Sequence, residues 1–173
     1  PRLLPAHADL AVKPARRHRR LQRAMRERRI DRRYLALVHG AFPPALTVDR
    51  PVGRDPRRRT RMSTHSDRPR DAVTHFRLVE AVPPYSLVEA RLETGRTHQV
   101  RVHLESAGHP VVGDPVYGRG RGGLGLGRQF LHAARLVFPH PDDEREIVVE
   151  SPLPPDLEGA LARARAEAGA GTR

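Results

Sequence analysis

Short apolar runs with the spacing and flanking residues of β-strands recur along this chain. Residues 34–40 (YLALVHG) are apolar, begin with an aromatic residue and end with a glycine, which predicts a buried strand. Residues 72–81 and 86–95 each contain a strand-like segment, and the VPPY between them predicts a hairpin. Two further strands are expected at residues 130–138 and 145–152.

Helical spacing is strongest near the start of the chain. In residues 16–33 (RRHRRLQRAMRERRIDRR), Leu21, Ala24 and Met25 follow the i, i+3, i+4 spacing of one helix face among ten arginines. We therefore expect an amphipathic helix over this segment.

Two more helices are expected further along the chain. Residues 97–107 place Val100 and Leu104 four positions apart and end before Gly108, a residue type that commonly stops a helix. Residues 154–168 (PPDLEGALARARAEA) predict a last helix that is entered through prolines.

Together these elements predict one α+β domain. Strands outnumber helices and pair as hairpins, so we expect a mixed, mainly antiparallel β-sheet with flanking helices over residues 13–168. Residues 51–70 are rich in arginine, proline and serine and predict a surface loop, and the glycine-rich residues 118–128 predict a flexible one. Residues 169–173 are expected to form a disordered tail.

The strong positive charge of the chain indicates what kind of partner it binds. The chain has 32 Lys and Arg against 20 Asp and Glu, a formal net charge of +12. This balance indicates a polyanionic partner, nucleic acid ahead of an anionic membrane. Lys13 is the single lysine, so nearly all the charge is guanidinium, which suits bidentate phosphate recognition. A GC-rich coding sequence would produce the same preference for arginine.

Other residue types exclude several classes of protein and site. The chain has no cysteine, which rules out disulfides and thiolate metal sites. No apolar run approaches the ~20 residues that a bilayer requires, and no signal peptide opens the chain, so we expect a cytoplasmic protein. His98, His103 and His109 lack a nearby cysteine or a carboxylate pair at metal-ligand spacing, so no metal is expected.

One short segment carries most of the candidate chemistry. Arg96, His98, Gln99, Arg101 and His103 fall within eight residues. In a helix, the first histidine and Arg101 share a face, as do the glutamine and the second histidine. The helix N-terminus also favours an anion, so the segment predicts a phosphate or carboxylate site. The alternative is a set of surface polar residues on a basic protein.

Four segments together resemble a known family. They are RRYLALVHG (32–40), PVGR (51–54), RLETGRTHQVRVHLESAGHPVVGDPVYG (91–118) and FLHAARLVFPHP (130–141). From about residue 13 to 155, the chain is similar to the RluA/RluD-type pseudouridine synthases of ribosomal and transfer RNA. The resemblance implies a mixed-sheet catalytic domain that acts on structured RNA as a monomer, without metal or cofactor. Its reaction converts uridine to the C-glycoside isomer.

The resemblance also implies roles for particular residues. Arg101 would pair with the nucleophilic aspartate, and Tyr34 would stack on a uracil extruded from its helix. The alternative for Tyr34 is a core aromatic at the start of a strand. The expected RNA-binding residues are Arg54, Arg57, Arg58, Arg59, Arg61, Arg96, His98 and Gln99, the last three contacting the RNA backbone or supporting Arg101.

The nucleophile itself is the point of departure from the family. The family carries it in a His-Arg-Leu-Asp segment. We expect residues 1–12 to hold only a remnant of that segment and the N-terminal part of the catalytic domain to be missing. If His7 is the motif histidine, Asp9 falls where the family has glycine; if residues 2–4 imitate Arg-Leu-Asp, Leu4 takes the place of the aspartate. Two functions therefore remain open: a pseudouridine synthase whose activity in this chain is in question, and a catalytically inactive RNA-binding protein of the same fold.

Overall fold

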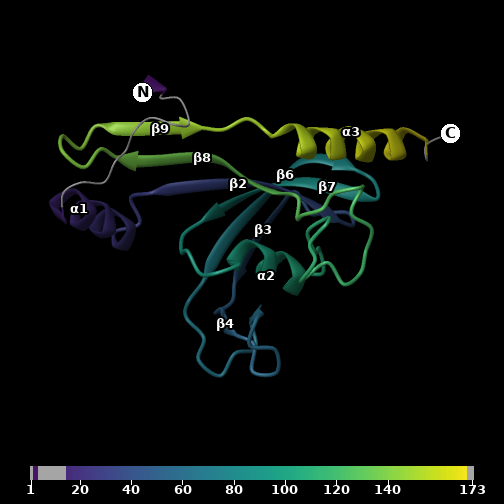
Figure 1. Ribbon diagram of the computed structural model, residues 1–173, viewed down its shortest axis with the longest axis horizontal. Coiled ribbons are helices and arrows are strands. Elements are labelled where there is room, and N and C mark those ends of the chain that lie inside the picture. Colours follow the sequence, from purple (N-terminus) through teal and green to yellow (C-terminus); the bar gives the residue numbers. More distant parts are fainter. Residues whose placement is uncertain (1, 4–14, 171–173) are drawn as a thin grey trace.

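A central β-sheet organises the computed structural model, which describes residues 2–3 and 15–170 (Figure 1). Within this part of the chain the sheet has seven strands in the order β1-β9-β8-β2-β7-β6-β3, and β4 and β5 form a separate two-stranded ladder. The elements are β1 Arg2–Leu3, α1 Ala15–Arg26, β2 Asp31–His39, β3 Ala45–Asp49, β4 Gly53–Arg54, β5 Met62–Ser63, β6 Val73–Val82, β7 Tyr85–Leu92, α2 Gln99–Ser106, β8 Leu131–Pro139, β9 Glu146–Glu150 and α3 Pro155–Ala170. Every neighbouring pair is antiparallel except β1 and β9, which confirms the mixed, mainly antiparallel α+β fold.

The two faces of the sheet carry different helices, α2 on one and α3 on the other (Figure 1). Thr74 on β6 hydrogen bonds to Gln99 and His103 of α2, so its side of the sheet is the α2 face. Cross-strand partners point to the same face, so the antiparallel register extends this assignment across the sheet. Leu87, which pairs with Leu37 on the opposite face, is buried in the same core cluster as Leu157 and Leu161 of α3.

Most of the predicted elements are confirmed. The strands expected at 34–40, 72–81, 86–95, 130–138 and 145–152 correspond to β2, β6, β7, β8 and β9, and the helices expected at 97–107 and 154–168 correspond to α2 and α3. In β6 and β7 one face is buried in the core, while the other, apart from the part under α3, carries charged side chains.

The predicted helix over residues 16–33 is wrong in its second half. Helix α1 ends at Arg26, and residues 31–33 pair with strands on both sides as part of β2. The backbone of Arg28 is left-handed, with φ of 56°, and its amide and the next one bond back to the last helical carbonyls. This conformation closes the helix, as a glycine usually does.

The apolar stripe expected on α1 is only partly used. Ala24 is buried, whereas Met25 is 53% exposed. Helix α1 is held instead by arginines: Arg17 pairs with Asp142 at 2.5 Å, and Nη1 of Arg20 donates to the carbonyl of Pro141 at 2.6 Å. The helix is thus attached to the β8–β9 turn mainly through polar contacts.

The loops and the end of the chain complete the fold. Residues 51–70 form an irregular segment around the short β4–β5 ladder, as expected for a surface loop. Helix α3 continues to Ala170, two residues into the segment predicted to be a disordered tail, and residues 171–173 lie outside the described part. Among the described residues, no helix is long and apolar enough to cross a membrane.

Candidate active site and RNA interface

Gln99 fixes the start of α2 on the sheet. Its Oε1 accepts hydrogen bonds from the Thr94 hydroxyl and the Arg96 amide, and its Nε2 donates to the carbonyl of Val73 and the hydroxyl of Thr74. With 2% of the residue exposed, these four bonds occupy both ends of the amide. We therefore assign Gln99 a structural role and leave it out of the RNA surface proposed below.

Arg101, two residues further along α2, is buried against a carboxylate of this chain. Its Nε and Nη2 each donate to Asp114 at 2.7 Å, and the backbone amides of Val116 and Tyr117 donate to the same carboxylate. Burial by itself raises the pKa of Asp114, but the bonds from Arg101 and the two amides outweigh it and lower that pKa. Both side chains are therefore ionised, and their pairing holds the loop after Gly113 against α2.

The expected partner of Arg101 was the nucleophilic aspartate of the family. Within the described residues its partner is Asp114, and Nη1 makes no hydrogen bond to this part of the chain. A guanidinium has a second edge, so this group can still bind a further anion. Leu4, His7 and Asp9, the residues considered for the nucleophile motif, lie outside the described residues.

Tyr117 joins α2 to the arginine-rich loop. The side chain is fully buried, and the guanidinium carbons of Arg61 and Arg101 lie 4.8 and 4.9 Å from its ring centroid. Its hydroxyl accepts a hydrogen bond from the amide of Met62 and bonds to Nδ1 of His98. Loop residues 61–62 and α2 are thus held by one aromatic ring.

His98 stands at the N-cap of α2 in a left-handed conformation, with φ of 58°. Burial first, and then the charge of Arg101, lower its pKa, so the ring is neutral at pH 7. A neutral imidazole bonded to Tyr117 positions the loop and adds no charge for an anion.

Tyr34 lies on the α2 face of the sheet. It pairs with Ala90, which pairs with Phe76, and Phe76 is two residues from Thr74 on β6. Alternation along β6 and the cross-strand pairs therefore place Tyr34 on the face that α2 covers. It is partly buried against the main core, so it also has the contacts of a core aromatic.

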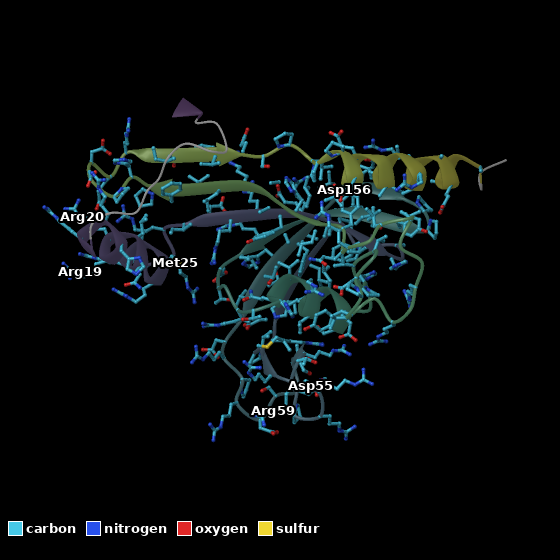
Figure 2. All side chains as sticks on the ribbon, viewed as in Figure 1. Arg19, Arg20, Met25, Asp55, Arg59 and Asp156 are labelled. Carbon is cyan, nitrogen blue, oxygen red and sulfur yellow. The ribbon has the colours of Figure 1, made fainter. Side chains whose placement is uncertain are left out.

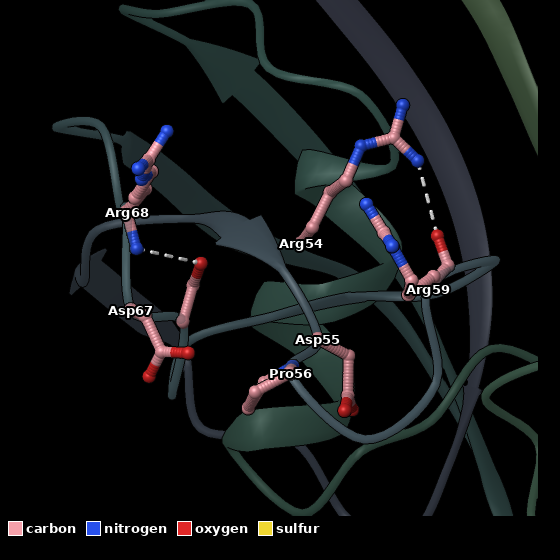
Figure 3. A pocket seen from close by; sticks show the side chains of 7 residues that line it. Arg54, Asp55, Pro56, Arg59, Asp67 and Arg68 are labelled. Atoms are coloured by element: carbon pink, nitrogen blue, oxygen red, sulfur yellow. Dashed lines mark hydrogen bonds between the residues drawn. The ribbon is translucent and has the colours of Figure 1, made fainter.

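Four of the expected RNA-binding arginines are exposed in the loop around the β4–β5 ladder. Arg54, Arg57, Arg58 and Arg59 are exposed, and the first and last line an open cavity of about 670 Å³ with Arg68 (Figure 3). The amides of Arg57 and Arg58 donate to Asp55 and lower its pKa. These bonds shape the loop while leaving the guanidinium groups in solvent.

The other expected RNA-binding residues have partners within the chain. Arg61 stacks on Tyr117 and lies 3.3 Å from Glu105, and Nε of Arg96 donates to the carbonyl of Asp71. A second group of arginines stands on α1, well away from the loop; Figure 2 labels Arg19 and Arg20 there, and Arg59 in the loop.

Asp114 and Tyr117 are not among the site residues expected from the sequence. Both belong to GDPVYG, where an aspartate is followed by proline and then by the two amides that it binds. Aspartate at the start of a proline-containing turn is the signal that could have identified the loop. Among the described residues, no group of three or more acidic, histidine or cysteine side chains could hold a metal ion.

Comparison with known proteins shows the family of this chain. Residues 13–106, more than half of the chain, match the model of the RNA pseudouridylate synthase family. The chain belongs to this family. The matched segment contains Tyr34, the arginine-rich loop and Arg101.

Relatives extend the match beyond residue 106. The chain is 53% identical over 140 residues to an "Uncharacterized RNA pseudouridine synthase" of Chloroflexus aurantiacus, covering 81% of this chain and 43% of the relative. It is 43% identical over 152 residues to "Ribosomal large subunit pseudouridine synthase D" of Nitrosomonas europaea, covering 84% and 44%. The chain therefore spans less than half the length of these pseudouridine synthases.

A solved structure has the same fold. "Human RNA Pseudouridylate Synthase Domain Containing 1" aligns with a TM-score of 0.68 and 32% identity, over 80% of this chain and 62% of the human one. The comparisons thus support the expected pseudouridine synthase domain.

Proposed function

We propose that this chain is the catalytic part of an RNA pseudouridine synthase that isomerises a uridine in structured ribosomal or transfer RNA in the cytoplasm. The observation that carries the proposal is the shared sheet face of Tyr34 and α2, with Arg101 buried in the first turn of that helix. A family match alone would leave open whether these residues lie on the same side of the sheet.

The roles follow from the chemistry. Isomerisation breaks the bond between C1′ and N1, turns the uracil and joins C5 to C1′, after which the C5 proton leaves to solvent and N1 takes up a proton. We assign Tyr34 to stacking on the extruded uracil, because the ring must be held while it is detached. We assign the free edge of Arg101 to the carboxylate that acts at the anomeric carbon, which it would keep ionised.

RNA binding is assigned to the exposed arginines. Arg54 and Arg59 line an open cavity, Arg57 and Arg58 are exposed in the same loop, and the arginines of α1 present a second basic surface. Guanidinium groups suit phosphate oxygens, and a monomer with a net charge of +12 attracts RNA over long range. The alternative is a protein of this fold that binds RNA without catalysis.

Tritium release separates these functions. The purified chain is incubated with ribosomal and transfer RNA transcripts labelled at uridine C5, and tritium in solvent is counted. We expect little or no release from the chain as given, because neither Tyr34 nor Arg101 can replace a nucleophilic carboxylate. Release after a His-Arg-Leu-Asp segment is supplied ahead of residue 13, and its loss in Tyr34→Ala and Arg101→Ala, would support the synthase.

Two outcomes would contradict these expectations: the first the inactivity of the chain as given, and the second the synthase itself. Strong release by the unmodified chain that Asp9→Asn abolishes would identify Asp9 as the nucleophile. Binding without release, even with the segment supplied, would leave the inactive RNA-binding protein as the function.

A further inference from the structure

Arg32 is a partly buried arginine without a partner in the described part of the chain. No hydrogen bond or ion pair joins it to those residues, and its Nε is buried without a hydrogen-bond partner. Its neighbour Arg33 differs, because it pairs with Asp31 at 2.9 Å and lies 3.8 Å from Glu89. Partial burial removes water from the guanidinium at a cost in free energy. An unpaired guanidinium is therefore unfavourable here unless an anion binds to it.

The position of Arg32 connects it with Tyr34. The two residues are separated by one residue on β2, whose pairing with β8 is regular from Asp31 to Arg33 and with β7 from Arg33 onward. Side chains at i and i+2 of a strand point to the same face, so Arg32 also lies on the α2 face. Two residues of a strand span about 6.6 Å, the scale of one nucleotide.

Gly95 keeps the space that the guanidinium occupies. A Cβ built on Gly95 would overlap Nη1 of Arg32 and lie 3.3 Å from its Cζ. Gly95 is exposed and leads into α2 through Arg96, whose amide bonds to Gln99. The guanidinium therefore lies against the exposed turn at the N-terminal end of α2, where a ligand from solvent can reach it.

We propose that Arg32 binds a phosphodiester of the RNA next to the uridine that stacks on Tyr34, and that the absence of a side chain at Gly95 leaves room for the guanidinium in this position. The inference rests on the proposed function and adds a positioning residue to it. A phosphate fits because its oxygens accept hydrogen bonds from the N–H groups of a guanidinium edge, and because each nucleotide carries a phosphate close to its base. The competing occupant is a carboxylate of the protein itself, which the test distinguishes.

The test compares variants of the full chain by fluorescence anisotropy with a labelled, unmodified transfer RNA transcript over a series of salt concentrations. Arg32→Gln is expected to weaken binding about tenfold and to reduce the slope of log K against log salt by about one, since one phosphate contact is lost. Arg32→Lys should lose less affinity, because it keeps the charge.

Two matched controls address charge and glycine. Arg77→Gln removes an exposed arginine that pairs with Glu89 on the opposite face, so affinity and slope should change little. Gly95→Ala should weaken binding about as much as Arg32→Gln, and the double variant should be no weaker than either. Gly122→Ala, where a Cβ would meet nothing within 4 Å, should bind normally.

Each other result overturns the proposal in a recognisable way. If Arg32→Gln binds like the unmodified chain while removal of Arg54 and Arg59 weakens binding, Arg32 has no phosphate role although RNA binding stands. If Arg32→Gln lowers the urea midpoint without changing the salt slope, a carboxylate of the protein is its partner. If the unmodified chain itself fails to bind the transcript, the proposed function fails with it.

Discussion

Gln99, Thr74 and His103 form a buried series of hydrogen bonds that ties α2 to β6. Nε2 of His103 bonds to the carbonyl of Arg50, which can only accept, so Nε2 carries the proton and Nδ1 accepts from the Thr74 hydroxyl. Burial is the main cause that lowers the pKa of His103, and the fold therefore holds the neutral ring.

This network predicts a loss of stability in mild acid. The pKa of His103 is lowered on folding, so the unfolded chain takes up the proton first as pH falls below about 6.5. Stability is fully present above that pH and decreases below it. His39 and His98 shift in the same direction and add to the effect. We expect the urea midpoint to fall between pH 7.5 and 5.5, and less steeply in His103→Gln; an equal slope in that variant would contradict this role.

The Arg101–Asp114 pair predicts a larger cost than a surface pair of the same geometry. Asp114→Asn leaves a buried guanidinium without its counter-charge and should destabilise the chain by about 3 kcal/mol in urea unfolding. Asp156→Asn is the control, because Asp156 forms a similar bidentate pair with Arg128 on the surface. Solvent screens that pair, so only a small change is expected there. Similar losses in both variants would show that burial does not matter here.

At the scale of elements, the sequence predicted those whose burial follows a regular period. Strands β6 and β7 alternate, and α2 stops at a glycine, so local pattern and fold agree. The end of α1 had no such signal, because an arginine adopts the left-handed conformation that glycine usually supplies. The partners of Arg101 and Gln99 depend on tertiary packing, and residue spacing alone could not give them. The resemblance to a family indicated that Arg101 and Gln99 matter, but it did not identify the residues that they contact.

Helix α1 differs from α2 in how it is attached, which predicts a difference in salt response. Arg17 of α1 reaches Asp142 in the β8–β9 turn, Arg29 just after the helix reaches Glu144 in the same turn, and Ala24 is the buried apolar contact. Exposed ion pairs weaken as salt rises, whereas the buried contacts of α2 do not. Hydrogen exchange measured by mass spectrometry should therefore be faster at residues 15–26 in about 0.5 M salt than in a buffer with roughly one fifth of that salt concentration. It should change little at residues 99–106.

The pair variant Asp142→Asn and Glu144→Gln should accelerate exchange at α1 even in low salt. Unchanged protection in this variant would mean that packing, and not charge, holds the helix.

At the scale of the whole molecule, charge decides how RNA is approached. The loop around the β4–β5 ladder and α1 are two basic surfaces on different parts of the molecule, each with exposed arginines (Figure 2). An RNA with extended structure can contact both, so the affinity should have a steep dependence on salt.

Replacing Arg57, Arg58 and Arg59 together by Gln measures how much this loop contributes to RNA binding. Each phosphate contact contributes about 0.7 to 0.9 to the slope of log K against log salt, so the triple variant should lose roughly two units of slope. The fold should persist, because these side chains are exposed. An unchanged slope, or a preference of the chain for anionic lipid vesicles over RNA, would contradict RNA binding through this loop.

Strand β3 lies at one end of the sheet order and pairs, among the described residues, with β6 alone. An open edge of this kind is a template on which another copy of the chain can add a strand, and hence a route to aggregation. Here the edge is only five residues long, follows Pro43 and Pro44, and ends at Asp49 and Arg50. Prolines donate no backbone hydrogen bond, and charges are costly to bring together, so this boundary protects a concentrated solution of the protein from edge-to-edge growth.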